Sequence, residues 1–207
     1  MESQKPKIAM YVKRPFGEKL NASFDFLKEN WKLLLRFTTY LLLPLCLIQA
    51  LSLNGLMSGA LSISAIASST AMAASSSSLI AFGSYYGLYM FLYLIGIILL
   101  TSLVYGLIRT YNEREERLQG VTLGMLKPRL FRNIKRLLLM TGACILLVLF
   151  VGIFVGLLVA LTPFTLFLTI PFIIAFSVPL ALLAPIYLFE DITLMEAFKK
   201  TFRLGFA

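Results

Sequence analysis

The stretch RTYNEREERLQGVTLGMLKPRLFRNIKR, residues 109–136, decides how this chain folds, because it is a charged island between two uncharged blocks. Residues 37–108 contain no Asp, Glu, Lys or Arg, and residues 137–189 contain none either. The two blocks are 72 and 53 residues long. A transmembrane helix needs about 20 mainly apolar residues, because the hydrocarbon core of a bilayer is roughly 30 Å thick. Each block is therefore long enough for a hairpin of two spans.

The composition also indicates a membrane protein. Hydrophobic residues make up 59% of the chain and charged residues 14%, and the mean hydropathy is +0.86. Soluble domains carry charge on roughly a quarter of their residues. We therefore expect an all-α integral membrane protein with four spans.

The basic residues predict how the chain is oriented. All 19 Lys and Arg residues lie outside the uncharged blocks, in residues 1–36, 109–136 and 199–203. If each hairpin returns the chain to the side that it left, all of them share one face, which the positive-inside rule makes cytoplasmic. We expect a multi-pass protein of the bacterial cytoplasmic (inner) membrane with both termini in the cytoplasm. Nucleic acid is not expected as a partner, since it needs basic residues on a folded soluble face.

The N-terminal part of the chain is predicted to stay on the cytoplasmic side. Residues 1–16 are basic and read as a tail. Residues 18–36 form an amphipathic helix, whose apolar positions recur at helical spacing opposite a basic face. We expect this helix to lie in the membrane interface, although it could instead pack on another part of a larger complex. The apolar positions are Leu20, Phe24, Leu27, Trp31 and Leu34.

The first hairpin is predicted to have spans at 37–53 and 84–108, joined by an outer Ser/Ala-rich loop at 54–83. Asn54 and Gly55 are expected to end the first span. If the Ser/Ala-rich stretch crossed the membrane, the charged island would be carried outside, against the positive-inside rule. A shallow re-entrant element or a small-residue lining for a pore are the alternatives for this stretch.

The second hairpin is predicted to have spans at 137–161 and 164–189. Across both hairpins, prolines are expected to kink the helices, and glycines in small-xxx-small patterns are expected to mark helix contacts. The kink residues are Pro44, Pro171, Pro179 and Pro185, and the packing glycines are Gly83, Gly87, Gly152 and Gly156. The residues expected to contact lipid headgroups are Lys28, Lys32, Arg36, Arg129, Arg132, Lys135 and Arg136.

The pattern of an interfacial helix followed by a hairpin occurs twice and begins a third time. Repeat 1 covers residues 17–108, and repeat 2 covers 109–189 with its cytoplasmic basic segment at 109–136. Residues 190–207 form a third interfacial helix, opened by a capping box from Thr193 to Glu196. The third repeat is incomplete, so we expect either a piece of a six-span protein or a last helix with another purpose.

The repeat, and above all the segment EDITLMEAFKKTFRLG at 190–205, resembles a loose group of uncharacterised bacterial six-span membrane proteins. The group includes the membrane domain associated with some glycerophosphodiester phosphodiesterases. The resemblance implies a six-span fold. The catalytic domain of those enzymes, with its His and acidic metal ligands, has no counterpart in this sequence, so the resemblance supplies no catalytic residue.

The sequence offers little for chemistry. There is no His, and the two Cys residues lie in apolar spans without metal-ligand spacing. Glu113, Glu115 and Glu116 alternate with Arg114 and Arg117, which indicates ion pairs rather than catalysis. We therefore expect no catalytic, cofactor-binding or metal residues and no enzyme activity.

Two classes of function remain. The first is a scaffold or accessory subunit of a membrane complex, with membrane lipids and either a second copy or another membrane protein as partners. The alternative is a transporter or channel-like facilitator for a neutral or lipidic substrate, since the spans lack the ionisable residues that mark ion pathways.

Overall fold

The computed structural model describes residues 7–9, 12–68, 76–162 and 164–206. These residues form six helices and no strand. Four helical stretches are long and apolar enough to cross a membrane, namely Phe16–Ser62, Leu79–Glu113, Leu123–Leu161 and Thr165–Phe189. The expected all-α class, with four helices of membrane-crossing length, is confirmed. The chain divides into two compact units, the first made of Met1–Leu103 with Arg114–Leu123 and the second of Val104–Glu113 with Gly124–Ala207.

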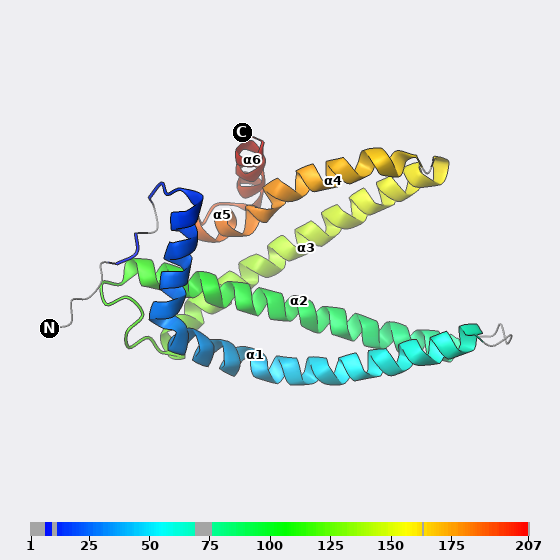
Figure 1. Ribbon diagram of the computed structural model, residues 1–207, viewed down its shortest axis with the longest axis horizontal. Coiled ribbons are helices and arrows are strands. Elements are labelled where there is room, and N and C mark those ends of the chain that lie inside the picture. The colour runs from blue at the N-terminus through cyan, green and yellow to red at the C-terminus, as the bar shows by residue number, and fades with distance from the viewer. Residues whose placement is uncertain (1–6, 10–11, 69–75, 163, 207) are drawn as a thin grey trace. The chain divides into compact units, whose positions relative to one another are not determined.

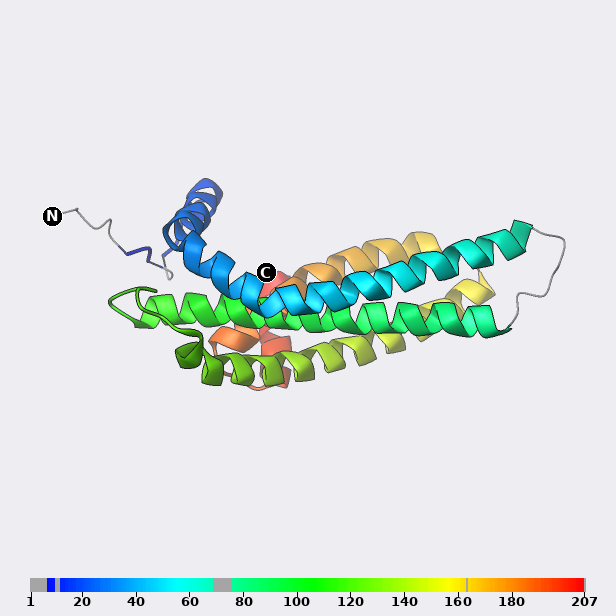
Figure 2. The same ribbon diagram turned by 90° about the horizontal axis from the view of Figure 1, so that it is seen from below.

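The first unit is built on a hairpin of α1 (Phe16–Ser68) and most of α2 (Ser76–Glu113). Figures 1 and 2 show the cyan part of α1 alongside α2, while its blue N-terminal part turns away at a steep angle. The Ser52 hydroxyl donates a hydrogen bond of 3.3 Å to the carbonyl oxygen of Tyr85, which joins the two helices. No break separates the predicted interfacial helix at 18–36 from the predicted span, because α1 is continuous and includes Pro44.

The described residues of the stretch predicted as a loop at 54–83 are helical, while its placement on the outer side stays a prediction. The helix α1 continues through Asn54 and Gly55 to Ser68, and α2 already begins at Ser76; residues 69–75 lie outside the described part of the chain. Gly55 does not end the helix but lets it approach α2, since a Cβ there would lie 2.5 Å from the Tyr85 ring. Gly55 therefore lies at a helix contact rather than at a turn.

The serines of this stretch are compatible with a helix because their hydroxyl groups form hydrogen bonds with backbone carbonyl groups of the same helix. The hydroxyls of Ser58, Ser62 and Ser64 donate to carbonyl oxygens three or four residues earlier, and Ser84 does the same at the start of α2. Such a bond satisfies the hydroxyl without water or another element. A Ser/Ala-rich sequence can thus continue an apolar helix. The prediction of a loop assumed that the serine hydroxyls need water or other protein groups as partners.

The second unit contains the last turns of α2, then α3 (Leu123–Leu161), α4 (Thr165–Ala181), α5 (Leu183–Phe189) and α6 (Leu194–Gly205). The helix α3 is continuous, so the amphipathic run within the predicted basic segment 109–136 and the third span form one helix. The predicted fourth span is divided at Leu182, whose N–H donates to the Pro179 carbonyl at 3.0 Å. Pro185 has no N–H to donate to the Ala181 carbonyl, which explains a break at this point.

The helix α6 packs on α4 and α5. The capping box expected at its start is confirmed, since the Thr193 N–H donates to Glu196 and the Glu196 N–H donates to the Thr193 hydroxyl. Leu183, Tyr187 and Ala197 form a buried core between α5 and α6. A cluster of phenylalanine rings extends this contact to α4, formed by Phe176, Phe198, Phe202 and Phe206.

The glycines predicted to pack helices are not those that do so within the chain. In the described residues, no atom lies within 4 Å of a Cβ built at Gly83, Gly87, Gly152 or Gly156. Close approaches occur instead at Gly55, Gly59 and Gly96 in the first unit and at Gly205, beside Pro179, in the second. A contact of the four predicted glycines with another chain stays a prediction.

We expect Gly205→Ala to destabilise the packing of α6 on α4, because a Cβ there would lie 2.9 Å from the backbone Cα of Pro179, which cannot move aside as a side chain can. Overpacking of this kind costs about 1–3 kcal/mol, which should outweigh the gain of about 1 kcal/mol that alanine brings to a helix. Circular dichroism of the purified protein in detergent measures the thermal midpoint, which should fall. Gly142→Ala is the matched control, because a Cβ there has open space; its midpoint should stay or rise. Equal midpoints in both variants would contradict the close contact between Gly205 and Pro179.

Candidate functional site

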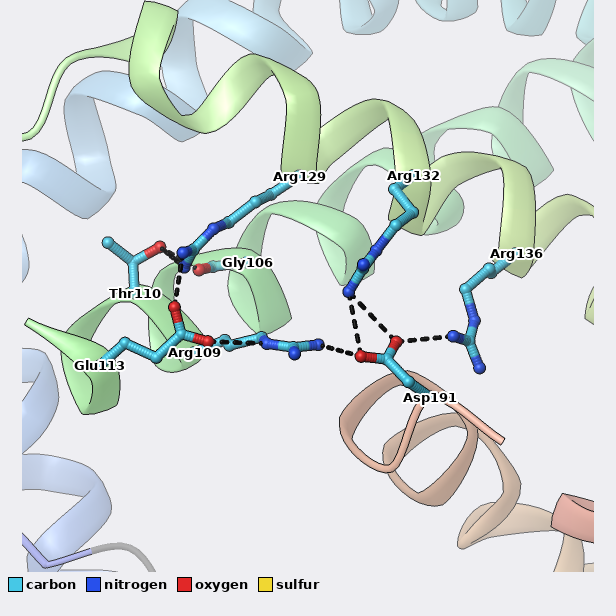
Figure 3. A network of polar contacts seen from close by, with 8 residues as sticks. All are labelled: Gly106, Arg109, Thr110, Glu113, Arg129, Arg132, Arg136 and Asp191. Atoms are coloured by element: carbon cyan, nitrogen blue, oxygen red, sulfur yellow. Dashed lines mark hydrogen bonds and ion pairs between the residues drawn. The ribbon is translucent and has the colours of Figure 1, made fainter. Parts of the chain in front are cut away.

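The main polar feature of the second unit is an arginine network at the ends of the apolar helices (Figure 3). Arg109 lies in the last turns of α2, and Asp191 lies between α5 and α6. Arg129, Arg132 and Arg136 project from α3. Their spacing of three and four residues puts them on one face of that helix. The network thus begins directly where the uncharged blocks end.

Asp191 is the centre of the network because three arginines bind its carboxylate. Arg109 Nη1 lies 2.9 Å from Oδ2, and Arg136 Nη1 lies 2.6 Å from Oδ1. Arg132 Nη2 donates to both oxygens at 3.1 Å. The backbone of Asp191 has a φ of 53°, in the left-handed region, which aspartate tolerates better than most residues.

Glu113 continues the network on the other side of Arg109. Arg109 Nε lies 3.0 Å from Glu113 Oε1, and Arg129 Nη2 lies 2.5 Å from Oε2. Arg129 Nη1 also donates to the Thr110 hydroxyl at 3.1 Å, and that hydroxyl donates to the Gly106 carbonyl at 2.7 Å. Four guanidinium groups therefore share two carboxylates, which leaves two positive charges in excess.

Arg136 also binds the backbone at the end of α5. Its Nη2 donates to the carbonyl oxygens of Tyr187 and Ile192, and its guanidinium carbon lies 4.2 Å from the centre of the Tyr187 ring. Its side chain is only 18% exposed. Arg136 thus fixes the junction that carries Asp191.

The charges around Asp191 determine its ionisation. Partial burial alone would raise the pKa of this carboxyl group. The hydrogen bond from Arg109 and the charges of Arg109, Arg132 and Arg136 outweigh burial and hold the pKa of Asp191 below its usual range. A lowered pKa means that the carboxylate contributes stability at neutral pH and loses it as the pH falls through the lowered pKa.

The structure changes the interpretation of the predicted headgroup contacts. Arg136 is mostly buried and its guanidinium group is bonded within the chain, so little of this side chain is left for a headgroup. Arg129 and Arg132 pair with carboxylates but stay partly exposed. The other four residues are exposed, and their contact with lipid stays a prediction: Lys28, Lys32, Arg36 and Lys135.

The ion pairs expected around residues 113–117 are present, although most partners lie elsewhere. Glu113 pairs with Arg109 and Arg129 in the second unit. In the first unit, Arg114 pairs with Glu116 at 3.2 Å, and Arg117 pairs with Glu29 at 2.7 Å.

The sequence reasoning missed Asp191. The only signal for it was an acidic pair, Glu190 and Asp191, placed directly after an uncharged span. Glu190 pairs with Lys200 on α6 at 2.7 Å, so both acidic residues fix this junction.

Among the described residues, no group of three or more His, Cys, Asp and Glu side chains could hold a metal ion. Comparison with known proteins adds no relative, because no family model, curated protein or solved structure matches the chain.

We expect Asp191→Asn to lower the free energy of unfolding by about 1–2 kcal/mol, the value of hydrogen bonds to charged groups reduced for a side chain that is 35% exposed. Asp191→Ala should cost more, because alanine also tolerates the left-handed backbone poorly. Chemical denaturation in detergent measures both, with Asp25→Asn on α1, an exposed residue, as the control.

The pH dependence separates the ion pairs from a general effect of substitution. Wild-type stability should decline as the pH falls toward and below about 4, the ordinary aspartate pKa, and this part of the decline should be missing in Asp191→Asn. Identical acid profiles would contradict the role assigned to Asp191.

Proposed function

We propose that this chain is a non-enzymatic integral membrane protein that acts as a scaffold or accessory subunit of a membrane complex. The supporting observation is the surface of α3. The most apolar 18-residue window of α3 has no residue buried within the described chain. Gly152 and Gly156 lie open on this helix, and small residues allow another helix to approach closely. The partner is a second copy of the chain or another membrane protein.

We further propose that the protein lies in a bacterial cytoplasmic membrane with both ends in the cytoplasm. Each hairpin takes the chain out and back, so residues 1–36, the island at 109–136 and α6 share one side. The positive-inside rule makes that side cytoplasmic. The lipid headgroups on this side meet Lys28, Lys32, Arg36 and Lys135, which are exposed.

The alternative function is a transporter or channel-like facilitator for a neutral or lipidic substrate. The division of the fourth span at Leu182 favours it, since transporters often place discontinuous helices around their substrate. Two features favour the scaffold instead. Leu182 lies only seven residues from the end of α5 at Phe189 rather than in mid-span. The residues that follow it, Leu183 and Tyr187, are packed against Ala197 of α6.

Disulfide cross-linking tests the scaffold proposal. In a Cys46→Ser, Cys144→Ser background, Leu149→Cys lies on the same face of α3 as Gly152 and Gly156, while Val151→Cys lies roughly opposite. We expect oxidation in membranes to give a covalent adduct from Leu149→Cys and not from Val151→Cys. Adding Gly152→Leu and Gly156→Leu should abolish the adduct by blocking close approach. Equal adducts from both faces would refute a partner on this face. No adduct from either would refute a second copy there, because a disulfide needs a cysteine on both partners.

Thiol labelling in intact cells tests the orientation. We expect a membrane-impermeant reagent to label Ser76→Cys, and to leave Gln119→Cys and Thr193→Cys unlabelled until the cells are opened. Labelling of Gln119→Cys in intact cells would mean that α1 and α2 do not return the chain to its starting side. Labelling of Gln49→Cys, within the first apolar block, would reveal a water-filled path and favour the transporter.

A further inference from the structure

The arginine network has more donors than its own carboxylates use. Arg132 binds Asp191 through Nη2 alone, and Arg109 uses Nε and Nη1 but not Nη2. Within the described part of the chain, the remaining N–H groups of Arg132 donate to no protein acceptor. Since the network also carries two positive charges in excess, it can bind a further anion without losing its internal pairs.

We propose that Arg132, with Arg129 and Arg109, forms a site for a phosphate group, supplied by the headgroup of an anionic phospholipid. The lipid source rests on the membrane placement proposed above. The side chain of Arg132 is 55% exposed and that of Arg129 is 40% exposed, whereas Arg109 is 30% exposed. The anion therefore meets Arg132 and Arg129 first, with Arg109 behind them.

The geometry of the three arginines fits phosphate. Arg129 and Arg132 lie three residues apart on α3, and Figure 3 shows Arg129 reaching to Glu113 and Arg132 reaching to Asp191, the two carboxylates that also bind Arg109. A guanidinium group is planar and presents parallel N–H donors, which match two oxygens of a phosphate. Glu113 pairs with both Arg129 and Arg109, and Asp191 pairs with both Arg132 and Arg109, so the two carboxylates bring the three guanidinium groups together.

The position of the site favours a lipid as the source. Arg109 directly follows the uncharged block that ends at Ile108, and Arg136 directly precedes the block that begins at Leu137. In a bilayer, residues at these borders lie at the depth of the headgroups, where basic pockets beside membrane helices bind anionic lipids. A phospholipid can then place its phosphate at the arginines while its acyl chains follow the exposed apolar surface of α3.

Native mass spectrometry of the full chain in a neutral detergent tests this site, with phosphatidylglycerol and phosphatidylcholine as probes. We expect retention of phosphatidylglycerol over phosphatidylcholine. Arg132→Gln should weaken phosphatidylglycerol binding by about tenfold, the effect of losing one charge-assisted contact. Lys127→Gln is the matched control, because it removes the same charge from the opposite face of α3; it should change binding less than about twofold.

Asp191→Asn keeps the test decisive if the arginine variant folds poorly. This substitution removes a carboxylate that competes with phosphate for the donors of Arg132. Phosphatidylglycerol should therefore bind several-fold more tightly. A folding defect would not increase the affinity for lipid. Inorganic phosphate identifies the source. If millimolar phosphate displaces the lipid, the site takes phosphate from either source; if it does not, the lipid itself is the ligand.

The proposal is overturned if Arg132→Gln and Lys127→Gln weaken binding equally, which would indicate diffuse charge, or if the two lipids bind alike. These outcomes do not depend on the scaffold. Native mass spectrometry measures lipid bound to the purified chain without any partner. A failure of the α3 cross-linking experiment would therefore bear on the scaffold proposal alone and leave the phosphate site untouched.

Discussion

The charged end of the second unit depends on the contact between Asp191 and three arginines. Arg109 comes from α2 and Arg132 and Arg136 from α3, so one carboxylate joins two helices to the α5–α6 junction. Without it, Arg109 would keep only Glu113, and Arg132 and Arg136 would lose the carboxylate that balances their charges. The left-handed backbone of Asp191 is unfavourable for a residue with a Cβ, and it is maintained because these ion pairs offset the cost. The placement of α6 follows from that junction.

The choice of arginine over lysine follows from the same constraint. Arg109 binds Glu113 with one nitrogen and Asp191 with another, which a single ammonium group cannot do in the same orientation. The lysines of α3 are placed differently. Lys127 and Lys135 lie off the face that carries Arg129, Arg132 and Arg136, and both are exposed. Within one helix, the residues that organise the fold and those that merely carry charge are thus separated by face.

The fold class could be predicted because it follows from the lengths of the uncharged blocks alone, without knowledge of tertiary contacts. A block of 72 residues without charge admits hairpins of helices and little else. The end of α1 could not be predicted, because Gly55 has the same local signature whether it ends a helix or packs against Tyr85, thirty residues away. Asp191 was missed for a similar reason, since it lies 82 residues from Arg109 and only tertiary structure brings them together. Local patterns identified the helices and their charged faces, but not the pairs that hold them.

The two hairpins differ in length, and the composition of the first accounts for its excess. The uncharged parts of α1 and α2 run to roughly 48–50 Å at 1.5 Å per residue, against roughly 37 Å for the uncharged part of α3. In a membrane, a hydrocarbon core of roughly 30 Å would accommodate the shorter helix with a modest tilt, whereas the longer pair would have to tilt strongly or extend beyond it. The additional length lies at the end of α1 and the start of α2, where the sequence is rich in serine and alanine rather than in leucine and isoleucine. Small side chains lose little when they leave the hydrocarbon, and serine hydroxyls bonded to their own helix, as at Ser62, are satisfied on either side of the boundary. The stretch that reads as a loop from composition is therefore suited to a helix that crosses the edge of a membrane and continues.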